Sequence, residues 1–399
     1  MKTTFLLALA ISSAAYSQAN FAGPINDNYT TGDTLTATTL NNIKSAVNDN
    51  DTTISDIDAS ITGINTRISD NTSSIDAAFS GDGSAGELTI TGSINWVTNP
   101  PVNPYFGNVI IMPGGILTVP AGTTIYCSGT FLNDGTLIVE PGTTTGRTLS
   151  TLTGSVSASN GRQYSQHPGD TPAPATMGEN HDTVLQANVT LYGGFGGLPI
   201  PKTVATTAFG NFRIGGGSGG GSASGSGKGG GLVKIYAGVN ILNSGIIEAK
   251  GGDAIVPGHG GGGGGIVILA TNGGGIQNIT GTIDVSGGNA FADNANYIGN
   301  GGGGGGGIII MASSPVAPLV GTGTEIVSGG SRGLGTISLT TTTQSAGGGG
   351  GGSGGLGGNG GNVSIVTGAG TPATGLGLAT SGASGYVISL ALDPRPLAR

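Results

Sequence analysis

Apolar side chains recur alternately four and three residues apart between Leu40 and Ile75. This is the heptad spacing of a helix whose apolar seam faces other helices, and it continues for about five heptads. Isoleucine at both seam positions favours three or more helices over two, so residues 40–79 are predicted to form a parallel trimeric coiled-coil stalk. The apolar seam residues are Leu40, Ile43, Val47, Ile54, Ile57, Ile61, Ile64, Ile68 and Ile75.

Two asparagines, Asn50 and Asn71, occupy seam positions. A polar residue in a coiled-coil core fixes the register and the number of chains at some cost in stability. The segment is otherwise rich in Thr, Ser, Asp and Asn, which are poor helix formers, so an isolated helix would be marginally stable. The alternative is one amphipathic helix that packs on its own domain.

A different pattern follows, because residues 80–104 are rich in turns and prolines, which cannot continue a helix. Over residues 108–142, apolar runs of about four or five residues alternate with turns that read PGG, PAG, NDG and EPG. Strands of this length separated by tight turns are typical of a β-helix or β-solenoid. Residues 143–214 are less regular and are interpreted as a long excursion from the stack.

The C-terminal half repeats one unit, a glycine run followed at once by a short apolar strand. A second short strand that ends in two glycines follows the first three units, at 246–252, 282–288 and 324–330. Repetition at a roughly fixed interval predicts a repeat architecture, which usually serves binding. The four glycine-run units span 229–237, 260–270, 301–312 and 357–367.

Composition narrows these interpretations. The 399 residues include 84 glycines, and only 9% are charged. Collagen would need glycine at every third position, and disorder would need fewer apolar residues. The net charge of −8, with no basic stripe, argues against a nucleic-acid partner. The single Cys127 cannot form an intrachain disulfide.

Residues 1–19 are predicted to be a secretory signal, with Lys2 before an apolar core and a small-x-small motif at Ser17–Ala19. No later stretch is long and apolar enough to predict a transmembrane helix. The predicted organisation is a signal peptide (1–19), an attachment segment (20–39), the stalk (40–79), a β-solenoid-like neck (80–214) and a glycine-rich tip (215–399).

The stretches RISDNTSS (67–74) and VNDNDTT (47–53) resemble the stalks of trimeric autotransporter adhesins. This resemblance implies polar layers around an anion on the three-fold axis. Asn71 followed by Thr72 fits that pattern, whereas Asn50 is followed by Asp51. The C-terminal membrane anchor of that family, a set of alternating amphipathic strands that ends in an aromatic residue, is not predicted here, and the last residues read DPRPLAR.

The motif GDGSAGELTI, the glycine-run units and a terminal GASGYVISL together resemble the glycine-rich tip adhesins of tailed-phage fibres. The resemblance implies glycine runs that form packed extended helices, with host recognition by the loops between them. Such helices need neighbours to satisfy their backbone donors, and only glycine allows that packing. Phage virion proteins lack secretory signals, so the chain more closely resembles the chimeric trimeric surface fibres of predatory Gram-negative bacteria.

The loops between glycine units, 253–259, 289–300 and 331–346, differ in length and content. Variable loops on one side of a repeat scaffold usually form the binding face. Aromatic and polar side chains on them suit glycan or protein receptors. The predicted receptor-binding residues are His259, Phe291, Asn294, Asn296, Tyr297 and Arg332.

Catalytic and metal chemistry finds little support in the sequence. Glu248, Asp284 and Glu325 recur at similar places in the second strands, where a row of solvated charges explains them better than a polysaccharide-cleaving site does. The three histidines lack the spacing of metal ligands, and the glycine runs lack the GK[ST] ending of a phosphate-binding loop. No cofactor, metal or enzymatic activity is predicted.

The fold class predicted from the sequence is mainly β, with a trimeric coiled-coil stalk followed by a β-solenoid-like tip with packed polyglycine helices. The predicted function is that of a secreted or cell-surface homotrimeric adhesin of a Gram-negative-type bacterium. It would bind a glycan or outer-membrane component, with an unknown partner anchoring its base. The alternatives are a phage-like receptor-binding protein, a polysaccharide-degrading β-helix enzyme and a structural matrix protein.

Overall fold

The computed structural model describes residues 36–141, 180–181, 189–191, 195–207, 212, 215–216, 219, 225–256, 258–291, 300–315, 318–334, 344–345, 350–361, 363–365 and 378–396. The predicted signal peptide lies outside the described residues, as does most of the predicted attachment segment. The chain divides into two compact units, Met1–Ser73 and Ser74–Arg399, and each is described by itself.

Helix α2 (Ala37–Ser80) occupies the predicted stalk segment. Its first turn is capped by Thr36, whose Oγ1 accepts a hydrogen bond from the backbone N–H of Thr39 at 3.2 Å. Its last turn ends at Gly81, which has a φ of +84° and donates its N–H to the Ala77 carbonyl at 2.9 Å. A left-handed glycine with this 5→1 bond is a common helix terminus, because a residue with a Cβ would be strained there.

The predicted fold class is wrong, because the described residues contain no coiled coil. They form two helices, α2 and the short α3 (Lys202–Thr207), together with three parallel sheets and two small antiparallel pairs. No second helix lies along α2 in the described part of the chain, and its apolar row is exposed, Ile54 and Ile68 included. The heptad spacing predicts which face of a helix is apolar, but an amphipathic helix without a helical partner satisfies the same spacing.

Each of the three parallel sheets has six strands, and consecutive strands of the chain fall in different sheets in turn. The first sheet contains β1 (Leu88–Ile90), β4 (Val109–Ile111), β7 (Phe131–Asn133), β12 (Ile241–Asn243), β15 (Ile276–Asn278) and β18 (Leu319–Val320). The second contains β2 (Ser93–Asn95), β5 (Ile116–Val119), β8 (Thr136–Val139), β13 (Ile246–Glu248), β16 (Thr282–Asp284) and β19 (Thr324–Ile326). The third contains β3 (Tyr105–Phe106), β6 (Thr123–Cys127), β11 (Leu232–Ala237), β14 (Ile266–Thr271), β17 (Ile308–Ser313) and β22 (Tyr386–Ala391).

We call the part of the chain that contains these sheets the three-sheet domain. Strands that precede and strands that follow residues 142–179 belong to the same sheets, since β6 pairs directly with β11 and β7 with β12. The antiparallel pairs are β9 (Asn180–His181) with β20 (Gln344–Ser345), and β10 (Val189–Leu191) with β21 (Val363–Ile365).

The core lies inside the three sheets, where every second side chain of a strand points inward. Strands β5 and β8 show this alternation, with Leu117, Val119, Leu137 and Val139 buried and their neighbours partly exposed. Cys127 belongs to this core as a free thiol, and burial raises its pKa to about 11. A thiol kept protonated in this way is unreactive at neutral pH.

The middle strands of the third sheet are buried on both faces, which explains why β14 and β17 are apolar except at their last residues, Thr271 and Ser313. A second apolar cluster covers its outer face, where Ile200, Ala205 of α3 and Phe212 pack against residues such as Ile268. The Tyr386 hydroxyl donates to the Ile200 carbonyl at 2.8 Å and fixes this covering segment.

A ladder of asparagines runs through the interior at the ends of β7, β12 and β15. Asn133 donates to Asn243 at 2.7 Å, Asn243 donates to Asn278 at 2.8 Å, and all three side chains are buried. Asn278 in turn donates to the Glu325 carboxylate at 2.8 Å. The ladder gives most of these buried amide groups a partner, and the Oδ1 of Asn133 is the ladder atom without a hydrogen bond among the described residues.

The C-terminal segment is tied down by Arg395. Its guanidinium contacts Asp76 at 2.7 Å and Asp393 at 2.8 Å. The hydrogen bonds from Arg395 lower the pKa of the Asp393 carboxyl below its ordinary value. These groups are substantially exposed, so the pairs contribute little stability each.

The variant Arg395→Gln is expected to lose about 1 kcal/mol or less of unfolding free energy at neutral pH. Because the pKa of Asp393 is lower in the folded state, its contribution is present above the unfolded pKa and is lost as the pH falls through the folded pKa. The difference between parent and variant should therefore shrink to zero in acid, as urea unfolding at pH 7 and at about pH 2 can measure. A difference that stayed constant with pH would contradict this assignment.

Candidate binding surface at the end of the glycine array

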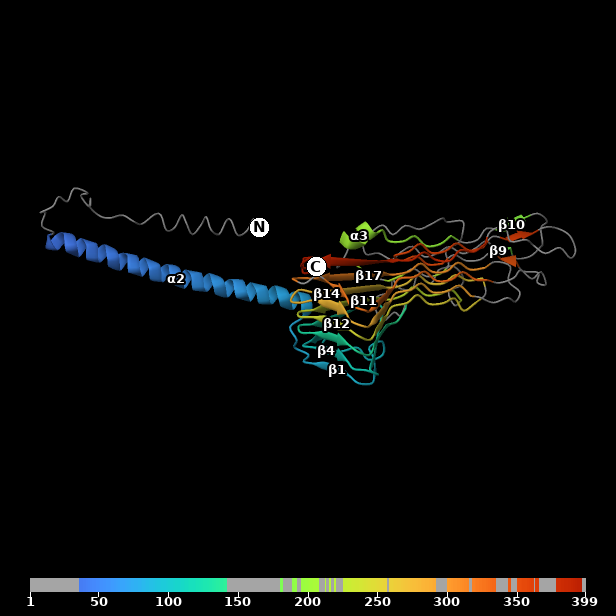
Figure 1. Cartoon of the computed structure of the whole chain (residues 1–399), viewed down its shortest axis with the longest axis horizontal. Coiled ribbons are helices and arrows are strands. Elements are labelled where there is room, and N and C mark those ends of the chain that lie inside the picture. Colours follow the sequence, from blue (N-terminus) through green and yellow to red (C-terminus); the bar gives the residue numbers. More distant parts are fainter. Residues whose placement is uncertain are drawn as a thin grey trace. The chain divides into compact units, whose positions relative to one another are not determined.

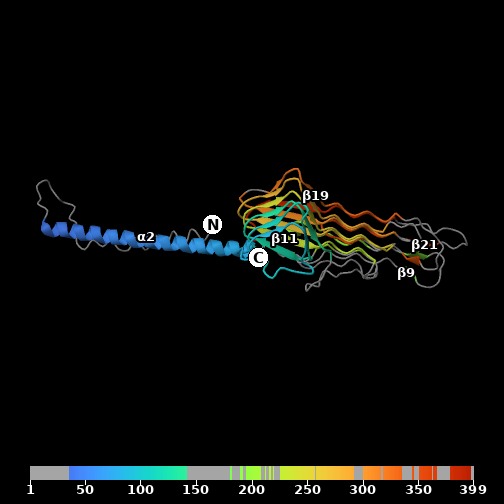
Figure 2. The ribbon, with the colours of Figure 1, turned by 90° about the horizontal axis from the view of Figure 1, so that it is seen from below.

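Glycine runs from different parts of the chain lie side by side in one array, which joins the strands of the third sheet and extends away from them toward β9 and β10 (Figures 1 and 2). The runs are hydrogen-bonded to one another through their backbones. We define the glycine array as residues 225–231, 250–254, 260–265, 286–290, 301–307, 328–333, 350–358 and 379–385.

Hydrogen bonds in the array repeat every three residues. The N–H groups of Gly227 and Gly230 donate to the carbonyls of Gly260 and Gly263, at 2.9 and 2.8 Å. The same step of three joins other pairs of runs: 260–265 with 301–307, 250–254 with 286–290, 286–290 with 328–333, and 301–307 with 379–385. Three residues per turn is the period of an extended polyproline-II-type backbone, which has no internal hydrogen bonds and must bond to neighbours.

One row of bonds crosses seven of the eight runs of the array. Gly382 donates to Gly330, Gly330 to Gly304 and Gly304 to Gly288, at distances of 2.7 to 3.0 Å. The row continues from Gly288 to Gly262, Gly252 and Lys228. A Cβ on Gly262, Gly304 or Gly330 would overlap a neighbouring backbone carbonyl. Only glycine therefore fits these positions, and the array is a platform held together by main-chain atoms.

The structure brings His259, Phe291 and Arg332 to the end of the array that is remote from the third sheet. Gly301 packs against the His259 carbonyl and accepts a hydrogen bond from Gly333 at 2.9 Å. Gly333 also packs against the Phe291 carbonyl. These contacts link three loops that are far apart in the sequence.

The side chains of this group differ in how firmly they are held. Arg332 donates to the Ala379 carbonyl at 3.1 Å, which fixes its guanidinium near the last run. His259 is half-buried, its Nδ1 has no hydrogen-bond partner in the described structure, and burial lowers its pKa. His259 is therefore neutral at pH 7, and Arg332 carries the positive charge of this group.

Three large apolar residues near the same end are exposed, and none of them is among the residues predicted from the sequence to bind a receptor. Ile255, Leu334 and Leu378 are 69%, 65% and 72% exposed. Ile255 donates its N–H to the Gly225 carbonyl at 2.9 Å, beside His259, and Leu378 precedes the carbonyl that binds Arg332. In the sequence, each of these three could have been recognised as a large apolar residue in a loop of otherwise small or polar residues.

The remaining predicted receptor-binding residues, Asn294, Asn296 and Tyr297, lie outside the described residues. Asn50 and Asn71 are exposed positions on α2. Their predicted role as core layers depended on the coiled coil, which the described structure does not contain.

The three acids of the second strands do not form one row. Glu248 and Asp284 are paired in register, and Lys250 contacts their carboxylates at 2.7 and 3.9 Å. Glu325 pairs with Ile283 instead, one position out of step, so its carboxylate points inward to Asn278. Asp284 and Glu325 thus face opposite sides of the second sheet.

No group of three His, Cys, Asp or Glu side chains that could hold a metal ion occurs among the described residues. Neither described helix is long and apolar enough to cross a membrane. Comparisons with known protein families, curated proteins and solved structures find no match to this chain.

Proposed function

We propose that this protein is an exported surface adhesin that binds a target-cell glycan or outer-membrane component. Binding would take place at the loop end of the glycine array. The homotrimer predicted from the sequence depended on the coiled coil and is not part of this proposal.

The observation that carries the proposal is the convergence of unlike loops on a platform held by backbone hydrogen bonds. His259, Phe291 and Arg332 come from three loops, yet their backbones contact one another through Gly301 and Gly333. A platform fixed before binding reduces the entropy that is lost when a receptor orders the loops. Aromatic and Arg side chains are the residue types that most often dominate binding energy at interfaces.

The exposed apolar residues Ile255, Leu334 and Leu378 extend this surface. Together with the neutral His259 and the charged Arg332, they give a mixed surface of apolar contacts and hydrogen-bond donors. Sugar rings and membrane-protein loops both offer apolar faces beside polar groups, so this mixture suits either receptor.

Replacing His259, Phe291 and Arg332 together by alanine is expected to weaken binding of the full mature chain to bacterial envelopes or a glycan array at least tenfold. A tenfold weakening corresponds to a loss of about 1.4 kcal/mol of binding free energy. Two interface hot spots usually contribute more than that. The matched control replaces the exposed Asn99, Val102 and Val239 of the three-sheet domain by alanine.

Both triple variants should melt close to the parent temperature, because the array variant removes one part-buried hydrogen bond, from Arg332 to the Ala379 carbonyl, and the packing of the half-buried His259 ring on Gly225. Equal binding by the two variants would place recognition elsewhere. Release of reducing ends from a bound polysaccharide, lost on Asp284→Asn, would favour the enzyme alternative instead.

A further inference from the structure

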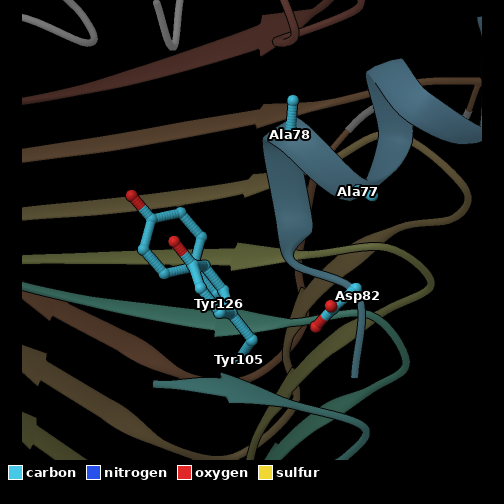
Figure 3. Close-up of a pocket in the computed structure, with 5 residues that line it drawn as sticks. All are labelled: Ala77, Ala78, Asp82, Tyr105 and Tyr126. Atoms are coloured by element: carbon cyan, nitrogen blue, oxygen red, sulfur yellow. The ribbon is translucent and has the colours of Figure 1, made fainter. Parts of the chain in front are cut away.

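An open cavity of about 340 Å³ lies where the last turn of α2 meets the three-sheet domain. It is lined by Ala77, Ala78, Asp82, Tyr105 and Tyr126 (Figure 3), all within the unit Ser74–Arg399. The volume lies at the lower end of the range for small-molecule sites. This cavity is separate from the loop residues of the glycine array.

The two tyrosines are held in place by a column of aromatic side chains on the third sheet. Tyr105, Tyr126 and Tyr236 are paired in register on β3, β6 and β11. The Tyr105 and Tyr126 ring centroids are 5.3 Å apart, and the Tyr126 ring meets the Tyr236 ring edge-on at 6.0 Å. Phe79 of α2 stacks on Tyr236 at 5.1 Å and closes the column. The rings that line the cavity are therefore fixed in advance of binding.

Gly81 brings the chain close to these rings. A Cβ at Gly81 would lie 2.9 Å from the Tyr105 ring and 3.2 Å from the Tyr126 Cβ. The left-handed turn at Gly81 then places Asp82 at the edge of the cavity, beside the tyrosines (Figure 3). Tyr105 stays 42% exposed, so part of its ring remains open to a ligand.

Three features of the cavity favour a positive charge. Hydrogen bonds from Ser84 lower the pKa of Asp82, so its carboxylate is ionised at neutral pH. Ala77 and Ala78 belong to the last turn of α2, where the helix dipole is negative. Tyrosine ring faces carry a negative quadrupole that attracts cations within about 6 Å. No Lys, Arg or His is among the five lining residues.

We propose that this cavity binds an alkylammonium group, with the Tyr105 and Tyr126 rings around its alkyl substituents and the Asp82 carboxylate facing its charge. The shared chemistry is a cation with an apolar skin, as in free choline or a phosphocholine lipid headgroup. A neutral sugar would find one carboxylate and the phenol hydroxyls, but nothing that uses the negative potential of the helix end.

The test is a titration of the full chain with choline and with its neutral isostere 3,3-dimethyl-1-butanol, followed by calorimetry or by NMR of the tyrosine resonances. The two probes have the same shape and differ in charge, so the isostere should bind at least about fivefold more weakly if cation–π and carboxylate attraction hold the ligand. Equal binding, or no saturable choline binding, would overturn the proposal.

Variants separate the contributions of the ring and the charge. Tyr105→Leu and Asp82→Asn should each weaken choline binding about fivefold, whereas Tyr105→Phe, which keeps the ring and loses the hydroxyl, should leave it unchanged. Asp56→Asn on α2 is the matched control, since it changes the net charge equally at an exposed site outside the cavity. An effect of Asp56→Asn as large as that of Asp82→Asn would reduce the result to general electrostatics and refute a defined site.

Two further probes identify the source of the ammonium group: phosphatidylcholine vesicles, compared with phosphatidylglycerol vesicles, and N-acetyl-lysine amide. Preference for phosphatidylcholine vesicles, lost in Tyr105→Leu, indicates a lipid headgroup, whereas binding of free choline alone indicates a small soluble ligand. Tighter binding of the lysine derivative than of choline would show that the cavity selects N–H donors and would overturn the proposal. These outcomes are independent of the array variant at His259, Phe291 and Arg332, so either proposal can fail without the other.

Discussion

Gly304→Ala is expected to destabilise the unit Ser74–Arg399 by about 3 kcal/mol or more, the upper end of the usual cost of overpacking. The added Cβ would overlap the Gly262 carbonyl, which belongs to a backbone and cannot rotate away as a side chain would. Gly304 also donates to Gly288 at 2.9 Å and accepts from Gly330 at 2.7 Å. Any shift that relieves the overlap therefore stretches two hydrogen bonds in the row that crosses the array.

Thermal unfolding followed by circular dichroism measures this effect, and a loss of about 6–12 °C in the melting temperature corresponds to about 3 kcal/mol for a domain of this size. Gly92→Ala is the matched control, because a Cβ there meets nothing within 4 Å and its φ is not in the left-handed region. The control should leave the melting temperature unchanged or raise it slightly through the unfolded state. Equal melting temperatures for both variants would show that the runs are not closely packed.

Asn243→Ala is expected to destabilise the three-sheet domain by about 2–5 kcal/mol, because it breaks the asparagine ladder at its centre. Asn133 would lose the acceptor it reaches at 2.7 Å, and the Oδ1 of Asn278 would lose its donor at 2.8 Å. Both groups are buried, so water cannot replace the missing partner without opening the core.

Urea unfolding of Asn243→Ala beside the exposed control Asn99→Ala tests this expectation, and the control should change the unfolding free energy by less than about 0.5 kcal/mol. Asn243→Asp is a sharper probe. A carboxylate still accepts from Asn133 but donates nothing to Asn278, and it places a charge in the core. If Asn243→Asp were as stable as the parent protein, the ladder would not contribute through its hydrogen bonds.

Much of the strand pattern was readable in the sequence. The apolar strands predicted directly after the four glycine runs are β11, β14, β17 and β21. The predicted second strands are β13, β16 and β19. Local chemistry decides these elements, because glycine cannot hold a buried strand and β-branched residues favour one.

The sequence pattern did not predict which element covers each apolar face. The seam over residues 40–75 gives the helix and its apolar side, but its spacing does not say whether a partner helix is present, and the only other helix among the described residues is the six-residue α3. By contrast, β14 and β17 are apolar on both faces because a distant segment around Ile200 covers them.

Two features had a sequence signal that was overlooked. The strands FLN, ILN and IQN each end in the asparagine that forms the ladder. The acid Asp284 is the third residue of β16 (TID), whereas Glu325 is the second residue of β19 (TEI). Successive side chains of a strand point to opposite faces of the sheet, so this shift by one residue turns Glu325 toward the interior, where it accepts from Asn278. The tyrosine column had a weaker signal, because the register of β3, β6 and β11 follows only from the fold.

The row of bonds from Gly382 to Lys228 affects how such a protein can evolve. Neighbouring runs meet largely through main-chain atoms, and side chains such as Asp253 and Asn289 add only single hydrogen bonds to backbone N–H groups of the next run. One run can therefore fit beside another with little matching of side-chain shapes. A core built from side chains must alter several residues together when a strand is added or exchanged. The array can instead gain, lose or swap a unit by duplication or recombination, while each glycine within a run stays invariant and the loops between runs are free to diverge.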